Sequence, residues 1–180
     1  RGANVLNNAF STTGGDGVTL ANTAHPTTFG GTWSNRSSTD ADINETSLEQ
    51  AMIDIAAFKD ERGFKIAARG LKLIIPSELQ FTAERILRSP ARVGTADNDL
   101  NALSSKGMLP QGYVVNNYLT DTDAFFIKTD VPNGMKMFNR ANLKTAMEGD
   151  FDTGNVRYKA RERYSFGFSD WRGMFGSPGA

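Results

Sequence analysis

The chain has a single histidine, His25, which is the first residue to consider for chemistry. A hydrolytic triad needs a serine beside a histidine and a carboxylate behind it. Ser11 and Asp16 lie near His25 in the sequence, but the chain has no G-x-S-x-G motif to present a nucleophilic serine. We therefore interpret His25 as a structural residue of a loop. A small hydrolase that uses His25 is kept as an alternative function.

The acidic and glycine-rich turns do not predict metal or phosphate chemistry. Residues 97–101 imitate the start of a calcium loop, but Ala102 replaces the required glycine and Met108 the required glutamate. Residues Gly14–Gly17 lack the Gly-Lys-Ser/Thr ending of a phosphate-binding loop. We expect no catalytic residue, no metal site and no cofactor.

A row of basic residues near the C-terminal end is a candidate binding surface. Side chains of a strand alternate between its two faces. A strand at residues 156–168 therefore places four cations on one face, namely Arg157, Lys159, Arg161 and Arg163. The row could bind DNA phosphates with an affinity that falls with salt, or face acidic residues of an identical subunit. It could also be a solvated face opposite acidic residues of a neighbouring strand, and the zero net charge favours this interpretation.

The opposite face of the same strand is apolar and needs a cover. We assign five aromatic residues to this apolar face: Tyr158, Tyr164, Phe166, Phe168 and Trp171. Thirteen residues at roughly 3.3 Å each span about 40 Å, which is too long for one edge of a small sandwich. At Asp170–Gly173 we expect Trp171 to be buried and the two charges to lie at the rim.

A helix, a strand and a second helix precede this region. Thr46 and Glu49 form a capping box, which predicts that a helix begins at Thr46, with Gly63 as its C-cap. The apolar stripe of this helix is Leu48, Ala51, Met52, Ile55 and Phe58. A strand at residues 71–75 follows, and the apolar run of that strand indicates a sheet covered by helices.

The second helix is predicted to begin at a capping box of Ser77 and Gln80 and to end at Arg88, before Ser89-Pro90. Phe81 falls on its charged face. Phe81 either packs under a loop of its own chain, which we favour, or is an aromatic residue of an interface. Further strands are predicted at residues 113–119, 124–129 and 135–140, and residues 11–42 and 91–112 are turn-rich.

The composition describes an ordinary globular protein of 180 residues, with 20 basic and 20 acidic side chains. The absence of cysteine excludes disulfides, thiolate nucleophiles and sulfur metal sites within the chain. The longest aliphatic run, at residues 73–75, is far too short to span a membrane, so no membrane partner is expected. The chain begins at Arg1 without a helix cap, and we interpret this start as an internal point of a longer polypeptide.

Several segments in order resemble the major capsid (head) proteins of tailed double-stranded DNA bacteriophages, in particular the Mu-type subgroup of the Hong Kong-type capsid fold. These segments are Val5–Phe10, Asp16-Gly17, Ala24-His25-Pro26, Leu71–Pro76, Pro110–Leu119 and Arg161–Arg172. Each segment is weakly specific, and their order and spacing make the resemblance. It covers nearly the whole chain.

The resemblance implies an α+β fold with an axial (A) domain and a peripheral (P) domain. Residues 1–41 would hold the end of the P-domain spine helix and a long connecting loop, residues 42–130 the A domain, and residues 131–180 the returning P-domain strands and the C-terminus. The long strand would pack along the spine helix. The family's N-terminal arm and extended loop have no counterpart in this chain.

The resemblance also implies a non-enzymatic shell protein of the virion, assembled in the bacterial host cytoplasm. Identical subunits would form pentamers and hexamers that close an icosahedral shell. Packaged double-stranded DNA would be held by weak non-specific contact, and scaffold, portal or decoration proteins would be further partners. The alternatives are an encapsulin-type compartment shell, the hydrolase that uses His25, and a monomeric β-rich binding module.

Overall fold

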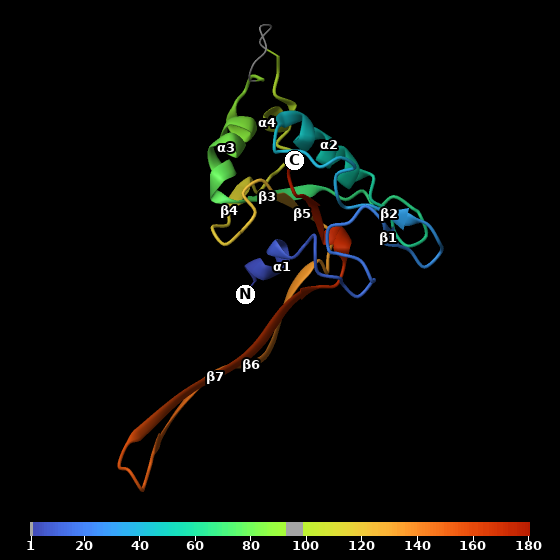
Figure 1. Cartoon of the computed structure of the whole chain (residues 1–180). Coiled ribbons are helices and arrows are strands. Elements are labelled where there is room, and N and C mark those ends of the chain that lie inside the picture. Colours follow the sequence, from blue (N-terminus) through green and yellow to red (C-terminus); the bar gives the residue numbers. More distant parts are fainter. Residues whose placement is uncertain (1, 93–98) are drawn as a thin grey trace.

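The computed structural model describes residues 2–92 and 99–180, and it has two parts (Figure 1). The larger part, here called the body, holds a small mixed sheet with helices above it and loops below. The second part, here called the hairpin, consists of β6 (Met135–Gly149) and β7 (Val156–Phe168), and it projects away from the body. The molecule is therefore elongated, with one lobe made only of two strands.

The sheet of the body has four strands in the order β4-β3-β5-β8. Their bounds are β3 Gly70–Ile75, β4 Tyr113–Val115, β5 Phe125–Thr129 and β8 Met174–Ser177. β3 and β4 run parallel, whereas the pairs β3–β5 and β5–β8 are antiparallel. The prediction of strands at 71–75 and 124–129 is confirmed, and the strand expected at 113–119 ends early, at Val115.

The alternation of strand side chains gives the sheet two buried faces. Leu73, Ile75 and Phe125 belong to the larger core, whereas Ile74 and Phe126, their neighbours in the sequence, belong to the smaller one. The sheet is therefore covered on both sides, which explains why its strands read as continuous apolar runs.

Three helices cover the face of the larger core: α2 (Glu45–Ala56), α3 (Gln80–Arg88) and α4 (Ala102–Ser105) (Figure 1). The prediction that Thr46 caps α2 is wrong. Asn44 is the N-cap, because its Oδ1 accepts the Ser47 N–H at 2.8 Å while Ser47 Oγ accepts the Asn44 N–H at 2.9 Å. The apolar stripe that begins at Leu48 faces the core as predicted.

Two other predicted caps are also wrong. Ser77 opens a short 3-10 turn, η1 (Ser77–Leu79), which leads into α3 without a side-chain cap, although α3 does end at Arg88. Gly63 lies beyond the end of α2, in a turn whose left-handed φ of 89° requires glycine. The turn-rich segment 91–112 contains α4, and its residues 93–98 lie outside the described part of the chain.

The opposite face of the sheet is covered by α1 (Ala3–Asn7) and the segment after it. Leu6, Ala9, Leu20 and Ala21 are buried there against Ile74, Phe126 and Met174. The chain then forms two short paired strands, β1 (His25–Pro26) and β2 (Thr32–Trp33). The long turn-rich segment is thus held on the body by buried residues at several points.

β6 and β7 form one continuous antiparallel ladder from the pair Met135–Phe168 to the pair Gly149–Val156. β7 has the predicted bounds, whereas β6 is fifteen residues long and extends well beyond the predicted end at Arg140. At the base of the hairpin, Gly134 and Gly173 touch backbone to backbone, so that a Cβ added at Gly134 would lie 2.9 Å from the Gly173 Cα. Glycine at both positions lets the hairpin leave the body at this point.

Trp171 lies in η2 (Trp171–Gly173) and is buried in the larger core of the body, so its assignment to the apolar face of the hairpin is wrong. β8 follows η2 and belongs to the central sheet, although it lies in the C-terminal segment after the predicted P-domain strands. No helix within residues 2–92 and 99–180 combines the length and apolar character needed to cross a membrane.

Candidate functional site

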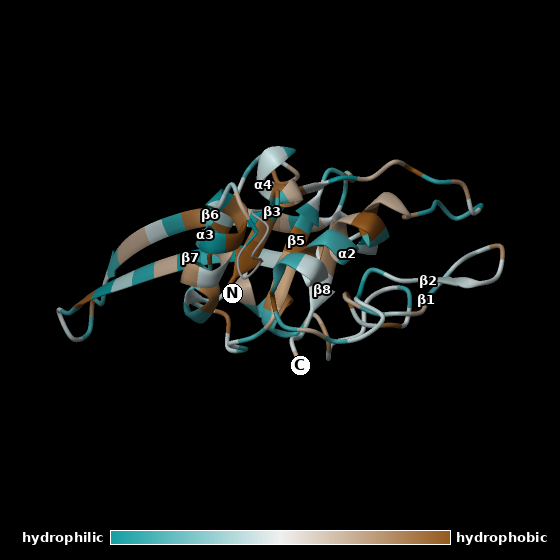
Figure 2. Ribbon diagram, turned by 90° about the horizontal axis from the view of Figure 1, so that it is seen from above, coloured by the Kyte–Doolittle hydropathy of each residue, from teal (hydrophilic) through white to brown (hydrophobic). Residues whose placement is uncertain are grey.

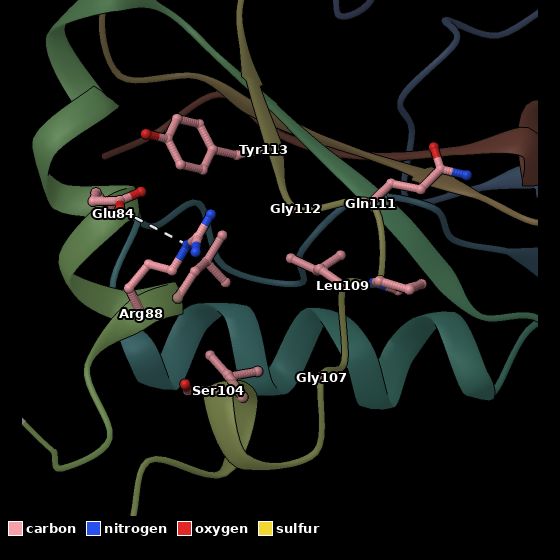
Figure 3. A pocket seen from close by; sticks show the side chains of 11 residues that line it. Glu84, Arg88, Ser104, Gly107, Leu109, Gln111, Gly112 and Tyr113 are labelled. Atoms are coloured by element: carbon pink, nitrogen blue, oxygen red, sulfur yellow. Dashed lines mark ion pairs between the residues drawn. The ribbon is translucent and has the colours of Figure 1, made fainter.

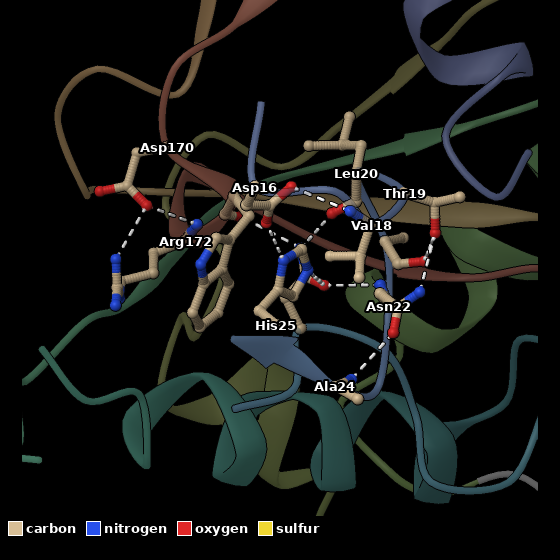
Figure 4. Close-up of polar contacts among 12 residues, drawn as sticks. Asp16, Val18, Thr19, Leu20, Asn22, Ala24, His25, Asp170 and Arg172 are labelled. Carbon is tan, nitrogen blue, oxygen red and sulfur yellow. Dashed lines mark hydrogen bonds and ion pairs between the residues drawn. The ribbon is translucent and has the colours of Figure 1, made fainter. Parts of the chain in front are cut away.

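His25 is fully buried and both of its ring nitrogens have partners (Figure 4). Nδ1 lies 2.6 Å from Asp16 Oδ2, and Nε2 lies 2.9 Å from Asn35 Oδ1. The ring stacks on Trp171 with a centroid distance of 4.4 Å and an angle of 9° between the planes. A histidine that acts as a general base must reach a nucleophile with a free nitrogen. His25 has none, and its interpretation as a structural residue is confirmed.

The buried Asn35 fixes the orientation of this cluster. Its Nδ2 points at the carbonyl oxygens of Leu20, Trp171 and Met174 at 2.7–3.0 Å, and its Oδ1 accepts the Asn22 N–H at 2.9 Å. Because Oδ1 is an acceptor, His25 Nε2 must carry the proton of their shared hydrogen bond. The cluster therefore ties the segment around residue 20 to the C-terminal end of the chain.

Arg172 extends the same anchor to the other side of Trp171. Its guanidinium donates to the Lys59 carbonyl and to Glu61, each at 2.7 Å, and its centre lies 4.4 Å from the Trp171 ring centroid. The hydrogen bond from Arg172 lowers the pKa of the Glu61 carboxyl, and the Thr28 N–H adds to this effect. The prediction that Trp171 is buried is confirmed, but Arg172 is buried with it instead of lying at the rim.

A cavity of about 790 Å³ opens between α3, α4 and the segment before β4 (Figure 3). Its ionisable side chains are Glu84, Arg88 and Tyr113. Glu84 accepts a hydrogen bond from the Tyr113 hydroxyl and raises the pKa of this phenol, which keeps it protonated. A protonated phenol and an ion pair provide neither a nucleophile nor a base.

Within residues 2–92 and 99–180, no three acidic or histidine residues gather to hold a metal ion, and Asp97 lies outside that range.

The hairpin presents the basic row on one open face. Across the ladder, Arg161 lies opposite Lys144, whereas Lys159 and Arg163 lie opposite alanines. Only Arg157 meets acidic groups of the hairpin: it lies opposite Glu148 and its Nη2 contacts Asp150 Oδ2 at 2.7 Å. The interpretation favoured from the sequence, a solvated face opposite acidic residues, is therefore wrong about the acidic residues opposite Lys159, Arg161 and Arg163. The row itself is exposed, as that interpretation expected.

The other face of the hairpin carries apolar side chains at its base and farther out, interrupted by Glu162 and by Asn139 opposite Tyr164, and it is covered only at its base. Tyr164, Phe166 and Phe168 are partly buried near α1, with Phe166 close to Gly2. Farther out, Tyr158 lies opposite Met147, and their side chains are 69% and 72% exposed. Figure 2 shows the resulting alternation of hydrophilic and hydrophobic bands along both strands.

Phe81 lies on the outer face of α3 and is 75% exposed. The interpretation that it packs under a loop of its own chain is wrong, and Phe81 stays a candidate for an interface.

The contribution of β6 side chains to both faces of the hairpin was missed from the sequence. Lys144 lies opposite Arg161 on the basic face, and Met147 lies opposite Tyr158 on the apolar face. The signal was obscured because two irregularities near Ala141 shift the alternation of β6.

The chain is similar to known proteins. A family model described as "Phage capsid protein" matches residues 1–176. Seven chains of solved structures match. One is described as "Crystal structure of virus-like particle from Pyrococcus furiosus"; it has a TM-score of 0.47 and 10% sequence identity over 79% of this chain and 55% of that one. The chain thus spans just over half of that structure. The curated proteins give no match.

Proposed function

The chain belongs to the phage capsid protein family, and from this premise we propose that it is the major capsid protein of a tailed phage, in the Mu-type subgroup of the Hong Kong-type fold. In this proposal, identical subunits form rings of five and six, and the rings close an icosahedral shell around double-stranded DNA. The protein then has a structural role in the virion and is assembled in the host cytoplasm.

The observation that carries the proposal is the hairpin. A two-stranded hairpin has no core of its own and is marginal in water. Here it exposes large apolar side chains, including Tyr158 and Met147, along the outer half of one face. Such a surface is typical of a contact with protein. The chain therefore has a lobe suited to being covered by other protein in an assembly.

The two faces of the hairpin also suggest an orientation. We assign the apolar face to protein contacts, which in this family would include the spine helix, because α1 already lies at the base of this face. The basic face, with Lys144 opposite Arg161, would turn towards the enclosed genome. Phosphate contacts of this kind are independent of sequence and weaken as salt rises.

The division into a P-domain segment at 1–41, an A domain at 42–130 and P-domain strands at 131–180 is part of the same proposal. Its support is that α2, α3, α4 and the parallel pair β3–β4 lie within 42–130, and the hairpin within 131–180. In the same proposal, scaffold, portal or decoration proteins are further partners of the shell.

Sedimentation velocity and negative-stain electron microscopy of the full-length protein test the proposal. We expect large particles of uniform size whose interior protects DNA from nuclease. A monodisperse monomer across a range of salt and with scaffold present would contradict it. Uniform particles that hold an enzyme cargo and no DNA would instead assign the chain to an encapsulin-type compartment.

A further inference from the structure

Two exposed apolar features lie on different helices of the body, α3 and α2 (Figure 1). The first is Phe81 on α3. The second is a groove of about 440 Å³ between α2 and α4, whose apolar lining includes Met52, Ile53 and Met108. Ile53 is 61% exposed in this groove, which is large for an isoleucine in a helix. One subunit therefore offers both an apolar knob and an apolar groove, on separate surfaces.

The charges beside the two features are complementary. On α3, Arg85 and Arg88 follow Phe81 at four and seven residues, which places all three on one side of the helix. On α2, Glu49 and Glu45 precede Ile53 at four and eight residues, again on one side. The sequence of α2 contains three carboxylates and neither lysine nor arginine.

We propose that α3 of one copy packs antiparallel against α2 of a second copy, with Phe81 in the groove beside Ile53. The helical rise separates Phe81 from Arg85 by about 6 Å, the same as the separation of Ile53 from Glu49. Arg85 then faces Glu49, and Arg88 faces Glu45. This inference rests on the proposed shell function, for which it names the contact between neighbouring subunits of a ring.

The remaining charged groups fit the same arrangement. Glu84, which lies 3.8 Å from Arg88 within α3, would approach Lys106 at the edge of the groove. Glu45 pairs with Arg92 in its own chain at 3.3 Å, so Arg88 would join an existing pair. The contact thus has an apolar centre and a charged rim, as specific interfaces do.

Because α3 and the groove between α2 and α4 lie on separate surfaces of the body, each subunit can use α3 on one neighbour and α2 on the other. Repeated head-to-tail contacts of this kind close into rings. A two-fold dimer would instead have to pack α3 against α2 twice within one patch, which the separation of the two helices disfavours. The positions of the two features therefore favour rings over two-fold dimers.

Charge reversal tests the pairing of Arg85 with Glu49. We expect Arg85→Glu alone and Glu49→Arg alone to reduce ring formation about tenfold or more, since like charges at an interface are costly. The two variants mixed in equal amounts should restore rings in which they alternate. At one junction the glutamate introduced at position 85 meets the arginine introduced at position 49. At the next junction the original Arg85 meets the original Glu49. Alternation requires an even number of subunits, so the mixture should give six-membered rings and no five-membered ones.

The apolar knob is tested by Phe81→Ala, with Phe29→Ala as the matched control. The two side chains are 75% and 73% exposed, so neither change should alter the thermal unfolding of the subunit. We expect Phe81→Ala to weaken ring formation about thirtyfold, as for a central interface anchor, and Phe29→Ala to have no effect.

Native mass spectrometry and sedimentation velocity of the full-length protein measure these outcomes. Normal rings from both single charge variants, or failure of the mixture to restore them, would overturn the inference. If wild-type protein forms shells and none of these changes affects them, the docking inference fails and the shell function stands. If wild-type protein forms no assembly at all, both fail.

Discussion

Arg161 lies directly opposite Lys144 across the β6–β7 ladder, so two cations share one face of the exposed hairpin. The neighbouring cross-strand positions on that face, Ala141 and Ala146, carry no charge that could offset them. Like charges directly opposite each other weaken a strand pair. A pair of this kind does not serve the stability of the isolated subunit, and we attribute it to contact with an anionic partner.

We predict that Arg161→Glu separates stability from assembly. The new carboxylate faces Lys144, so the free energy of unfolding should stay the same or rise by up to about 0.5 kcal/mol. DNA-filled particles should form less well, because a phosphate contact is lost and a negative charge is added. Urea unfolding and sedimentation measure the two effects.

Arg157→Glu is the matched control, since Arg157 has partners within its own chain. The change removes the ion pair with Asp150 and places two carboxylates opposite each other at Glu148. The end of the hairpin should then be destabilised. Equal losses of unfolding temperature and of assembly for Arg161→Glu would show that the basic row only supports the fold.

A second prediction concerns the apolar face. Tyr158→Ser removes an exposed side chain, so the unfolding temperature of the subunit should change little. Particle yield should fall, because in the assembly the same ring is covered by protein. Phe168→Ala should instead destabilise the subunit by about 2–3 kcal/mol, since Phe168 is partly buried against the smaller core. Unchanged particle yield for Tyr158→Ser would show that this part of the hairpin stays in solvent.

The third prediction tests the anchor at Asn35. Asn35→Ala leaves the Leu20, Trp171 and Met174 carbonyls without their donor and removes the acceptor of His25. Several buried groups lose hydrogen bonds together, and we expect a loss of about 3–5 kcal/mol in the free energy of unfolding, measured in urea. His25→Ala should cost less than Asn35→Ala, and the reverse order would contradict the role given to Asn35.

The fourth prediction concerns acid. Arg172 holds the pKa of Glu61 below its ordinary value of 4.5, so the folded protein binds fewer protons at this carboxyl than the unfolded chain. The stabilisation is complete above the ordinary value and is lost as the pH falls through the lowered value of the folded state. The Glu61 side chain is 46% exposed and the pair is screened by solvent, so Glu61→Gln should be less stable than wild type by only about 0.5 kcal/mol at neutral pH.

Thermal unfolding of Glu61→Gln and wild type from pH 7 to pH 3 checks this sign. The difference in unfolding temperature between the two proteins should be constant down to about pH 5. It should then shrink towards zero as the pH falls below 4.5. A difference that grows in acid would contradict the assignment. Asp60→Asn, on the neighbouring residue, is a control that leaves the bond between Arg172 and Glu61 in place.

Much of the central architecture follows from local sequence. The apolar run at 71–75, the alternation at 156–168 and the stripe that begins at Leu48 each determine an element, because burial on one or two faces leaves a clear period. Cap positions were less predictable. The sequence pattern predicts Thr46 as the N-cap of α2, whereas the actual N-cap, Asn44, depends on a reciprocal pair of hydrogen bonds that only the folded turn reveals.

The surroundings of the candidate surfaces depend on contacts between distant residues. Nothing local indicates that Asn35 meets the carbonyls of Trp171 and Met174, more than 130 positions away. The pairing of Arg161 with Lys144 likewise depends on two irregularities in β6 that reset the register. The basic row itself was visible from the sequence, whereas its lack of acidic neighbours was not.

Electron cryo-microscopy of particles formed by the full-length protein tests the shell function most directly. The account predicts a closed shell of rings in which protein covers Tyr158 and Met147, while Lys144 and Arg161 face the enclosed DNA. Particles in which both faces of the hairpin remain in solvent, or a protein that stays monomeric under all assembly conditions, would contradict it.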